Sequence, residues 1–182
     1  AKGIAALEPT PSGSKAAAAA IMTSDTFAKE FAVEVKTSKG NFRIGGIAKG
    51  AGMIDPNMAT MLCVVSTDAA LPQPVLRKEL RRSVANSFNR ITIDGDMSTN
   101  DTVIVLANGA SGMNTARRNG SACKQFREAL KWVMLELAKA VVRDGERVTK
   151  FVTVNVKGAR THLDAKKVAE AVCKSALVKS SW

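Results

Sequence analysis

The sequence predicts a mixed fold of the α/β or α+β class, in which helices pack on a sheet in layers. Short runs of alternating or continuous apolar residues, typical of strands, are interleaved with segments whose apolar residues recur every third or fourth position, typical of helices. The chain has 182 residues, of which 46% are apolar and 24% charged, and this composition supports one globular core. No run approaches the roughly 18 apolar residues of a membrane-spanning helix, so we expect no membrane partner.

The first part of the chain predicts a helix, a hairpin and a buried strand. Ser14 is placed to cap a helix that runs to Met22. Residues 33–37 alternate with period two, and a glycine-containing turn separates them from a return strand that begins at Phe42. The continuous apolar run over residues 61–65 is typical of a buried strand. We expect the glycine pair at positions 45 and 46 to loosen the backbone before that strand.

The second part predicts three helices separated by strands. Apolar residues recur at every fourth position from Leu76 to Phe88, with arginine and lysine between them, which is typical of an amphipathic helix with a cationic outer face. A stripe from Phe126 to Val141 predicts a longer helix, which Gly145 is placed to end. The other expected elements are strands over residues 92–93, 103–106 and 151–156 and a helix over 163–174.

The charge of the chain is strongly basic and unevenly distributed. The sequence has 27 Lys and Arg against 16 Asp and Glu, a net charge of +11. Residues 1–76 hold 7 basic and 6 acidic residues, whereas residues 77–182 hold 20 and 10. Such an excess attracts anions, but the chain has no Tyr, six Phe and two Trp, too few aromatic residues for the usual single-strand binder. We therefore expect a solvated basic face and no nucleic-acid partner. The alternative, nucleic-acid binding, would require an affinity for nucleic acid that falls steeply with salt concentration.

Cysteine and histidine usage excludes several kinds of site. The three cysteines form no C-x-x-C pair, and their odd number argues against a disulfide framework, so we expect a reducing, cytoplasmic setting. His162 is the single histidine, which makes a Ser-His-Asp catalytic triad or a zinc site improbable. No glycine-rich segment has the spacing of a nucleotide-binding P-loop. We expect no metal and no cofactor. No signal peptide is visible, and the first residue is not Met, which indicates a processed or cut chain.

One segment offers a nucleophile that needs no histidine. Residues 49–62 read Lys-Gly-Ala-Gly-Met-Ile-Asp-Pro-Asn-Met-Ala-Thr-Met-Leu, so a glycine-rich loop presents the hydroxyl of Thr60 at the mouth of the buried strand. If the bond between Ala59 and Thr60 is cut, Thr60 becomes an N-terminal threonine whose own amine serves as the base. By spacing alone, a threonine that opens a strand is more often structural than catalytic.

The same segment closely resembles the self-cleavage motif of the ornithine acetyltransferase family, the glutamate N-acetyltransferases of arginine biosynthesis. Further stretches resemble the same family in the same order, over residues 21–26, 94–102 and 144–151. The resemblance extends over nearly the whole chain from about residue 16. It implies a layered sheet-and-helix sandwich of the N-terminal-nucleophile type.

The resemblance also implies a mechanism and a set of site residues. A precursor of this family cuts itself at the position of Ala59 and Thr60, so residues 1–59 correspond to the C-terminal part of an α-chain and residues 60–182 to the N-terminal part of a β-chain. Thr60 is then the nucleophile that passes acetyl from N-acetylornithine to glutamate, and acetyl-CoA is a second donor in bifunctional members. The family further implies a heterotetramer of two α and two β chains. The positions that match its substrate contacts are Thr23, Lys49, Thr60 and Glu146.

The chemistry of these residues is compatible with such roles. Lys49 suits the α-carboxylates of ornithine and glutamate, and Glu146 suits an ammonium group. From the sequence alone, a solvated loop lysine and an exposed helix-end glutamate are the simpler interpretations. Residues 94–102 are most simply a turn rich in side-chain hydrogen bonds, although Asn100 or Asp101 would also suit the border of an active site.

The sequence departs from the family pattern in two respects. Arg147 and Val148 stand where the family has Gly-Ala, and this leaves the backbone around Glu146 uncertain. The family's oxyanion-hole Thr-Gly pair and its C-terminal substrate-binding Asn and Thr lie outside this sequence, so we expect the chain to be an internal segment. The alternative is a catalytically incomplete fragment or pseudoenzyme that acts as a binding module through its basic face.

Overall fold

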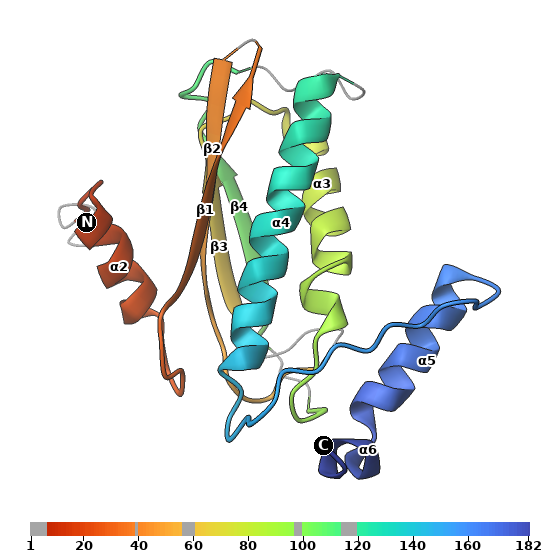
Figure 1. Cartoon of the computed structure of the whole chain (residues 1–182). Helices are drawn as coiled ribbons and strands as arrows, with labels where there is room; N and C mark the ends of the chain where they lie inside the picture. Colours follow the sequence, from red (N-terminus) through yellow and green to blue (C-terminus); the bar gives the residue numbers. More distant parts are fainter. Residues whose placement is uncertain (1–6, 39, 56–60, 97–99, 114–119) are drawn as a thin grey trace.

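The protein is built around one four-stranded sheet (Figure 1). The computed structural model describes residues 7–38, 40–55, 61–96, 100–113 and 120–182. The strands lie in chain order and comprise β1 (Lys29–Thr37), β2 (Gly40–Lys49), β3 (Leu62–Thr67) and β4 (Thr102–Ala107). β1, β2 and β3 pair antiparallel, whereas β3 and β4 pair parallel. The helices are α2 (Pro11–Ala20), α3 (Gln73–Ala85), the short η1 (Phe88–Arg90), α4 (Ser121–Arg143), α5 (His162–Lys174) and α6 (Ala176–Ser180).

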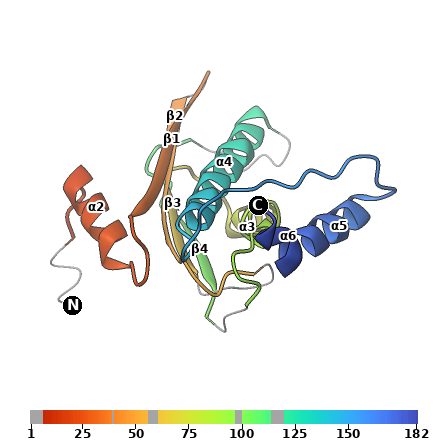
Figure 2. The same ribbon diagram turned by 60° about the horizontal axis from the view of Figure 1, so that its bottom comes forward.

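The helices form layers on the two faces of the sheet. α4 packs across β1 and β2 with α3 beside it, while α2 lies on the opposite side of the sheet (Figures 1 and 2). The predicted apolar stripe of α4 is fully buried, namely Phe126, Leu130, Val133, Leu137 and Val141. It packs against buried sheet residues, which include Phe42, Ile44, Ala48, Cys63 and Val65. The predicted layered α/β class, the hairpin and the two long helices are therefore confirmed.

The glycine pair of β2 has a different role from the one predicted. Gly45 and Gly46 lie within the regular strand and do not interrupt it. A Cβ on Gly46 would lie only 3.0 Å from the side chains of Leu137 and Val65, so this glycine permits the close approach of α4. A Cβ on Gly45, which points to the other face of the sheet, would make an ordinary 3.5 Å contact with Ala32.

The pair allows a matched test of this packing. We expect Gly46→Ala to lower the free energy of unfolding by about 1–3 kcal/mol, because the added methyl overpacks the interface between β2 and α4. Gly45→Ala, on the same strand, is expected to leave stability unchanged or raise it slightly. Urea unfolding of both variants measures the difference, and equal stabilities would contradict the packing role of Gly46.

The first helix begins earlier than predicted. Thr10, not Ser14, is its N-cap, and its hydroxyl oxygen accepts the backbone N–H of Gly13 at 3.1 Å. Pro11 occupies the first helical position, where its missing N–H and fixed φ are suited. The prediction missed this start because the segment has the Pro-Ser-Gly composition of a turn. The helix also ends at Ala20, before the predicted Met22.

Two predicted strands are absent from the structure. Residues 92–93 lie in a loop, and the N–H of Ile93 donates to the carbonyl of Ile54 at 2.7 Å. Residues 151–156 form a segment without secondary structure that leads from α4 to α5 (Figures 1 and 2). Both segments have strand-like composition, but a strand also requires a neighbouring strand for its backbone groups, and neither has one among the described residues.

α3 has the predicted amphipathic character. Phe88 is buried in η1, just beyond the helix, which ends at Ala85 and is therefore shorter than the apolar repeat. The basic residues of its outer face are exposed, namely Arg77, Lys78, Arg81 and Arg82. Among the described residues, no helix combines the length and apolarity needed to cross a bilayer.

Candidate functional site

The predicted cleavage position adjoins an edge of the sheet where three strands meet. Ala59 and Thr60 lie outside the described residues, but Met61, the next residue, is described. β2 ends at Lys49, which pairs with Leu62 of β3. The N–H of Met61 donates to Oδ1 of Asp101 at 2.8 Å, just before β4 begins. Met61, the residue after the predicted nucleophile, is thus held by the side chain that directly precedes β4.

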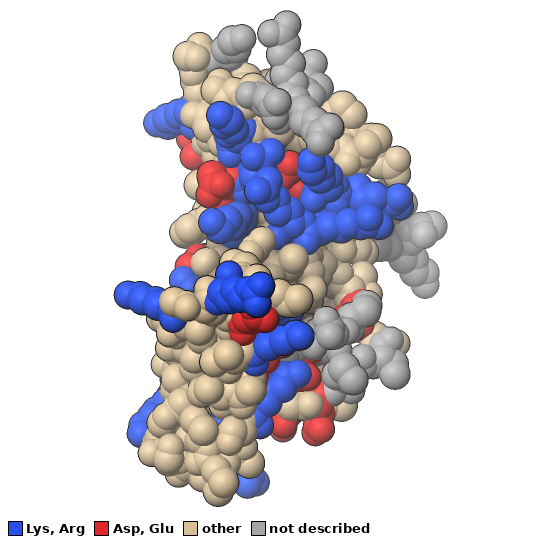
Figure 3. Space-filling view, turned by 90° about the vertical axis from the view of Figure 1, so that its right-hand side faces the viewer, with Lys and Arg blue, Asp and Glu red and all other residues tan. Residues whose placement is uncertain are grey.

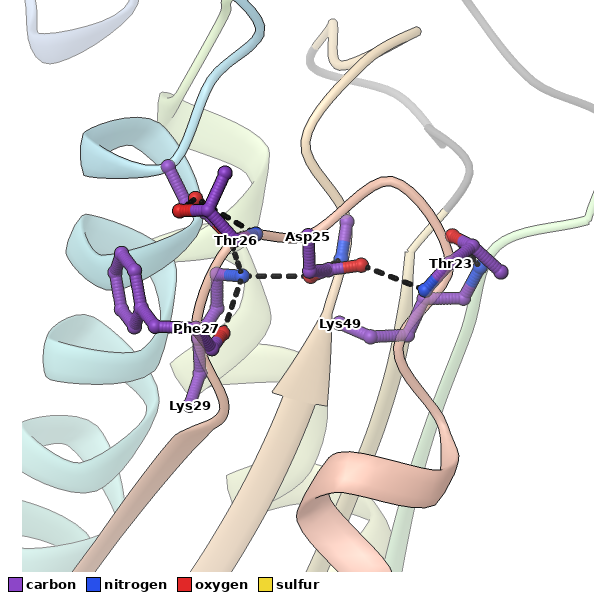
Figure 4. Close-up of polar contacts among 8 residues, drawn as sticks. Thr23, Asp25, Thr26, Phe27, Lys29 and Lys49 are labelled. Carbon is purple, nitrogen blue, oxygen red and sulfur yellow. Dashed lines mark hydrogen bonds and ion pairs between the residues drawn. The ribbon is translucent and has the colours of Figure 1, made fainter.

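Lys49 and Thr23 are in direct contact at this edge. The Nζ atom of Lys49 donates to the hydroxyl oxygen of Thr23 at 3.2 Å, although the two residues are 26 positions apart (Figure 4). Lys49 comes from the end of β2, and Thr23 from the loop between α2 and β1. Because an ammonium group has three N–H donors, this contact leaves Lys49 with donors that suit a carboxylate.

A buried aspartate lies behind this pair. Oδ1 of Asp25 accepts the N–H of Gly50 at 2.7 Å and the Nζ of Lys29 at 2.6 Å, and Oδ2 accepts the N–H of Thr23 at 3.1 Å (Figure 4). Burial alone raises the pKa of Asp25. The hydrogen bonds from Lys29, Gly50 and Thr23 outweigh this effect and hold the pKa below its ordinary value, so the carboxylate is ionised.

Lys29 joins this aspartate to the end of α4. Its ammonium group also pairs with Oδ2 of Asp144, the C-cap of α4, and the side chains of all three residues are at most 1% exposed. Asp144 additionally accepts the N–H of Thr26 at 3.0 Å. Burial raises the pKa of Asp144, but the hydrogen bonds from Lys29 and Thr26 hold it below its ordinary value. Lys29 also lies 4.8 Å from the centre of the Phe27 ring.

Glu146 lies beside the loop that follows Lys49. Its N–H donates to the carbonyl of Ala51 at 2.9 Å, and a Cβ on Gly52 would lie 2.8 Å from its Oε1. The unexpected Arg147 adopts a left-handed conformation with φ of 58°, and a turn closes between Val148 and Gly145. The departure from the family pattern therefore still leaves the Glu146 carboxylate over the glycine-rich loop.

The segment that contains Asp94 and Asp101 anchors the strands and loops around the site. The carboxylate of Asp94 accepts the N–H groups of Met53 at 2.6 Å and Ile54 at 3.0 Å. Its Oδ1 also accepts the N–H of Asp96 at 3.0 Å, a local side-chain hydrogen bond of the kind predicted for this segment. Burial raises the pKa of Asp101, while the Met61 N–H and the charge of Lys49 lower it in part. Asp101 and Met61 also line a largely apolar cavity of about 460 Å³ beside α3.

The remaining candidate groups lie apart from this arrangement. Cys63 is a core thiol, because it is fully buried in β3 and burial raises its pKa to about 12. His162 is exposed at the start of α5, with Nε2 3.2 Å from Nη2 of Arg90. Within the described ranges, no group of three or more His, Cys, Asp or Glu side chains is arranged to hold a metal ion.

Comparison with known protein families matches the model described as the ArgJ family over residues 1–182. The chain belongs to the ArgJ family. The family resemblance of its motifs is therefore confirmed, and a solved structure of the same family supports the layered α/β fold of the N-terminal-nucleophile type.

Individual members of the ArgJ family match the chain over part of their length. It is 50% identical over 177 residues to the arginine biosynthesis bifunctional protein ArgJ of Symbiobacterium thermophilum, a match that covers 97% of the chain and 44% of that relative. It is 52% identical over 167 residues to the glutamate N-acetyltransferase of Methanocaldococcus jannaschii, covering 91% and 40%. The crystal structure of ArgJ from Bacillus halodurans matches with a TM-score of 0.60 and 38% identity, over 63% of this chain and 53% of that one. The chain thus spans less than half the length of these two sequence relatives.

The structure describes three of the predicted site residues and places two of them in direct contact. Thr23 contacts Lys49, and Glu146 contacts the loop that begins directly after Lys49. Asp25 and Lys29 were not among the predicted site residues, although Asp25 lies in the stretch over residues 21–26 that resembles the family. For Lys29, the signal was its place in the alternating pattern of β1. The other charged residues of this strand are exposed, whereas Lys29, at its first position, is buried.

Proposed function

We propose that the protein containing this chain is a glutamate N-acetyltransferase that moves acetyl from N-acetylornithine to glutamate through Thr60. One observation carries the proposal. Two of the positions that match the family's substrate contacts, Thr23 and Lys49, are in contact, and Lys49 pairs with the first residue of β3; the third position, Glu146, contacts the loop that follows Lys49. The names of the relatives, ArgJ and glutamate N-acetyltransferase, support the same activity.

The proposal includes a division of the chain. Residues 1–59 are the end of an α-chain and residues 60–182 the beginning of a β-chain, with self-cleavage between Ala59 and Thr60. The sheet would then contain strands from both chains, because β1 and β2 precede the cut and β3 and β4 follow it. Such intermixed strands favour chains that stay together, in line with a heterotetramer of two α and two β chains.

The proposed reaction has two acyl-transfer steps. The free amine of Thr60 takes the hydroxyl proton while the oxygen attacks the acetyl carbonyl of N-acetylornithine, and ornithine leaves with that proton. The amine of glutamate then attacks the threonyl ester, which releases N-acetylglutamate and restores the hydroxyl. Lys49 pairs with the α-carboxylate that both substrates carry, whereas Glu146 pairs with the side-chain ammonium group of N-acetylornithine, which glutamate lacks.

The mass of the intact protein tests this proposal. We expect two chains divided between Ala59 and Thr60, and addition of N-acetylornithine alone should add one acetyl group to the chain that begins with Thr60. Glutamate should then remove that group. A single chain that never gains acetyl would reject the proposal.

The basic face favours a second candidate function, a noncatalytic binding module. Lys and Arg side chains gather on the side of the molecule shown in Figure 3, and the exposed basic residues of α3 contribute to this charge. Exposed basic side chains of this kind attract anions even where no binding pocket exists, and salt screens this attraction. An uncut chain with salt-sensitive binding to an acidic partner would favour this function over catalysis.

Lys49 distinguishes the two functions. We expect Lys49→Ala to lower kcat/KM roughly tenfold to a hundredfold, because a charge-assisted hydrogen bond to substrate is lost. Self-cleavage should be affected less, since it involves no external carboxylate. The control is the double variant Arg77→Gln/Lys78→Gln on the exposed face of α3, which should leave kcat/KM nearly unchanged. A larger loss in the α3 variant would reassign function to the basic face.

A further inference from the structure

We propose that Asp25 is a positioning residue, which fixes the relative placement of Thr23 and Lys49 and so sets the affinity of the site for its carboxylate substrates. The inference rests on the proposed function, because it concerns the site that binds those substrates. Asp25 is distinct from the residues assigned above, since its side chain is 0% exposed and does not reach the solvent side of the site.

The first reason is that Asp25 holds both members of the pair through their backbones. Oδ2 accepts the N–H of Thr23 at 3.1 Å, and Oδ1 accepts the N–H of Gly50, directly after Lys49, at 2.7 Å. One carboxylate therefore joins the loop that contains Thr23 to the end of β2, although Asp25 and Gly50 are 25 positions apart in the sequence. The 3.2 Å contact between the Lys49 ammonium and the Thr23 hydroxyl depends on the placement of both segments.

The second reason is that both segments leave regular structure at this point. Thr23 lies between α2 and β1, outside any helix or strand. Gly50 follows the last residue of β2 with φ of +139°, a conformation that L side chains rarely adopt. The chain thus turns out of the sheet immediately after Lys49, and the hydrogen bond to Asp25 anchors that turn (Figure 4).

The third reason is that Asp25 is itself fixed. Lys29 pairs with it at 2.6 Å in a site that excludes water, and Asp144 pairs with Lys29 from the end of α4. A buried charge that is held by several hydrogen bonds has little freedom to reorient. Through Lys29 and Asp144, the positions of Thr23 and Lys49 are therefore fixed relative to α4, the helix that packs on the sheet.

The test compares Asp25→Asn with a control that removes another buried carboxylate. Glu79 of α3 is 2% exposed and pairs with Arg127 at 2.8 Å, on a helix that carries none of Thr23, Lys49 and Glu146. In the intact protein, we expect both Asp25→Asn and Glu79→Gln to lower the melting temperature. Only Asp25→Asn should raise KM for glutamate and N-acetylornithine, by roughly tenfold, with a smaller change in kcat.

A double-mutant cycle separates positioning from general destabilisation. In the Lys49→Ala background, the further effect of Asp25→Asn on KM should fall to about threefold or less, because the group that it positions is gone. Equal effects in the two backgrounds would overturn the proposal. So would a rise in KM for Glu79→Gln as large as that for Asp25→Asn.

A second variant covers the case in which Asp25→Asn does not fold. Asp25→Glu keeps the charge beside Lys29 but moves the acceptor oxygens by one methylene, so KM should still rise, and an unchanged KM would refute the role of Asp25. The wild-type protein decides the underlying function independently. If the wild type transfers no acetyl, the proposed function fails, whereas an active wild type with unchanged KM in the Asp25 variants rejects only the positioning role.

Discussion

Thr60→Ala is expected to abolish both self-cleavage and acetyl transfer, the largest effect predicted for any single substitution in this chain. The variant lacks the hydroxyl that would attack the carbonyl of Ala59 and later carry the acetyl group. It removes only one hydroxyl and one methyl next to Met61, whose N–H is held by Asp101, so the fold should persist. Intact mass should show one uncut chain, and steady-state kinetics should show no transfer above background.

Thr60→Ser provides the matched control. It retains the hydroxyl and should still cleave, more slowly, because loss of the β-methyl increases the rotational freedom of the nucleophile. Retained cleavage at the same bond in Thr60→Ala would contradict the assignment of the nucleophile. Cleavage that stops in both variants would instead indicate that the methyl group is needed to set the geometry of the bond.

Local patterns predicted much of this fold because they report directly which face of an element is buried. The stripe from Phe126 to Val141 follows the helical period, and all five of its residues lie in the core. The hairpin was predicted for a similar reason, since an alternating run, a glycine turn and a second run define adjacent antiparallel strands. In both cases, the information lies within about 20 residues of chain.

The missed features depend on partners distant in the sequence. Residues 151–156 have the composition of a strand, but composition does not supply a neighbouring strand. Lys29 and Asp144 are separated by 115 positions, and each alone has the properties of an ordinary surface residue. The motif resemblance indicated Thr23, Lys49 and Glu146 as a set, but the network that holds Thr23 and Lys49 together required the three-dimensional structure.

Lys29→Ala is expected to have the largest effect on stability. The substitution leaves the carboxylates of Asp25 and Asp144 buried, at 0% and 1% side-chain exposure, without their shared cation. Removal of one partner from a buried ionic network costs about 3–5 kcal/mol, because the remaining charges are neither hydrated nor paired. Lys131→Ala is a suitable control, since Lys131 forms an exposed pair with Glu128 at 3.7 Å that should contribute less than about 1 kcal/mol.

The pH dependence of this loss identifies its cause. In the wild type, the pKa values of Asp25 and Asp144 lie below their ordinary range, so their contribution to stability is present above about pH 4 and is lost as the pH falls through the folded-state values. Without Lys29, burial favours the protonated carboxyls, so the variant gains relative stability as they take up protons. The difference in unfolding free energy between wild type and Lys29→Ala should therefore be largest near pH 7 and shrink towards about pH 4. A difference that stays constant over this range, measured by urea unfolding, would attribute the loss to packing of the lysine side chain instead of its charge.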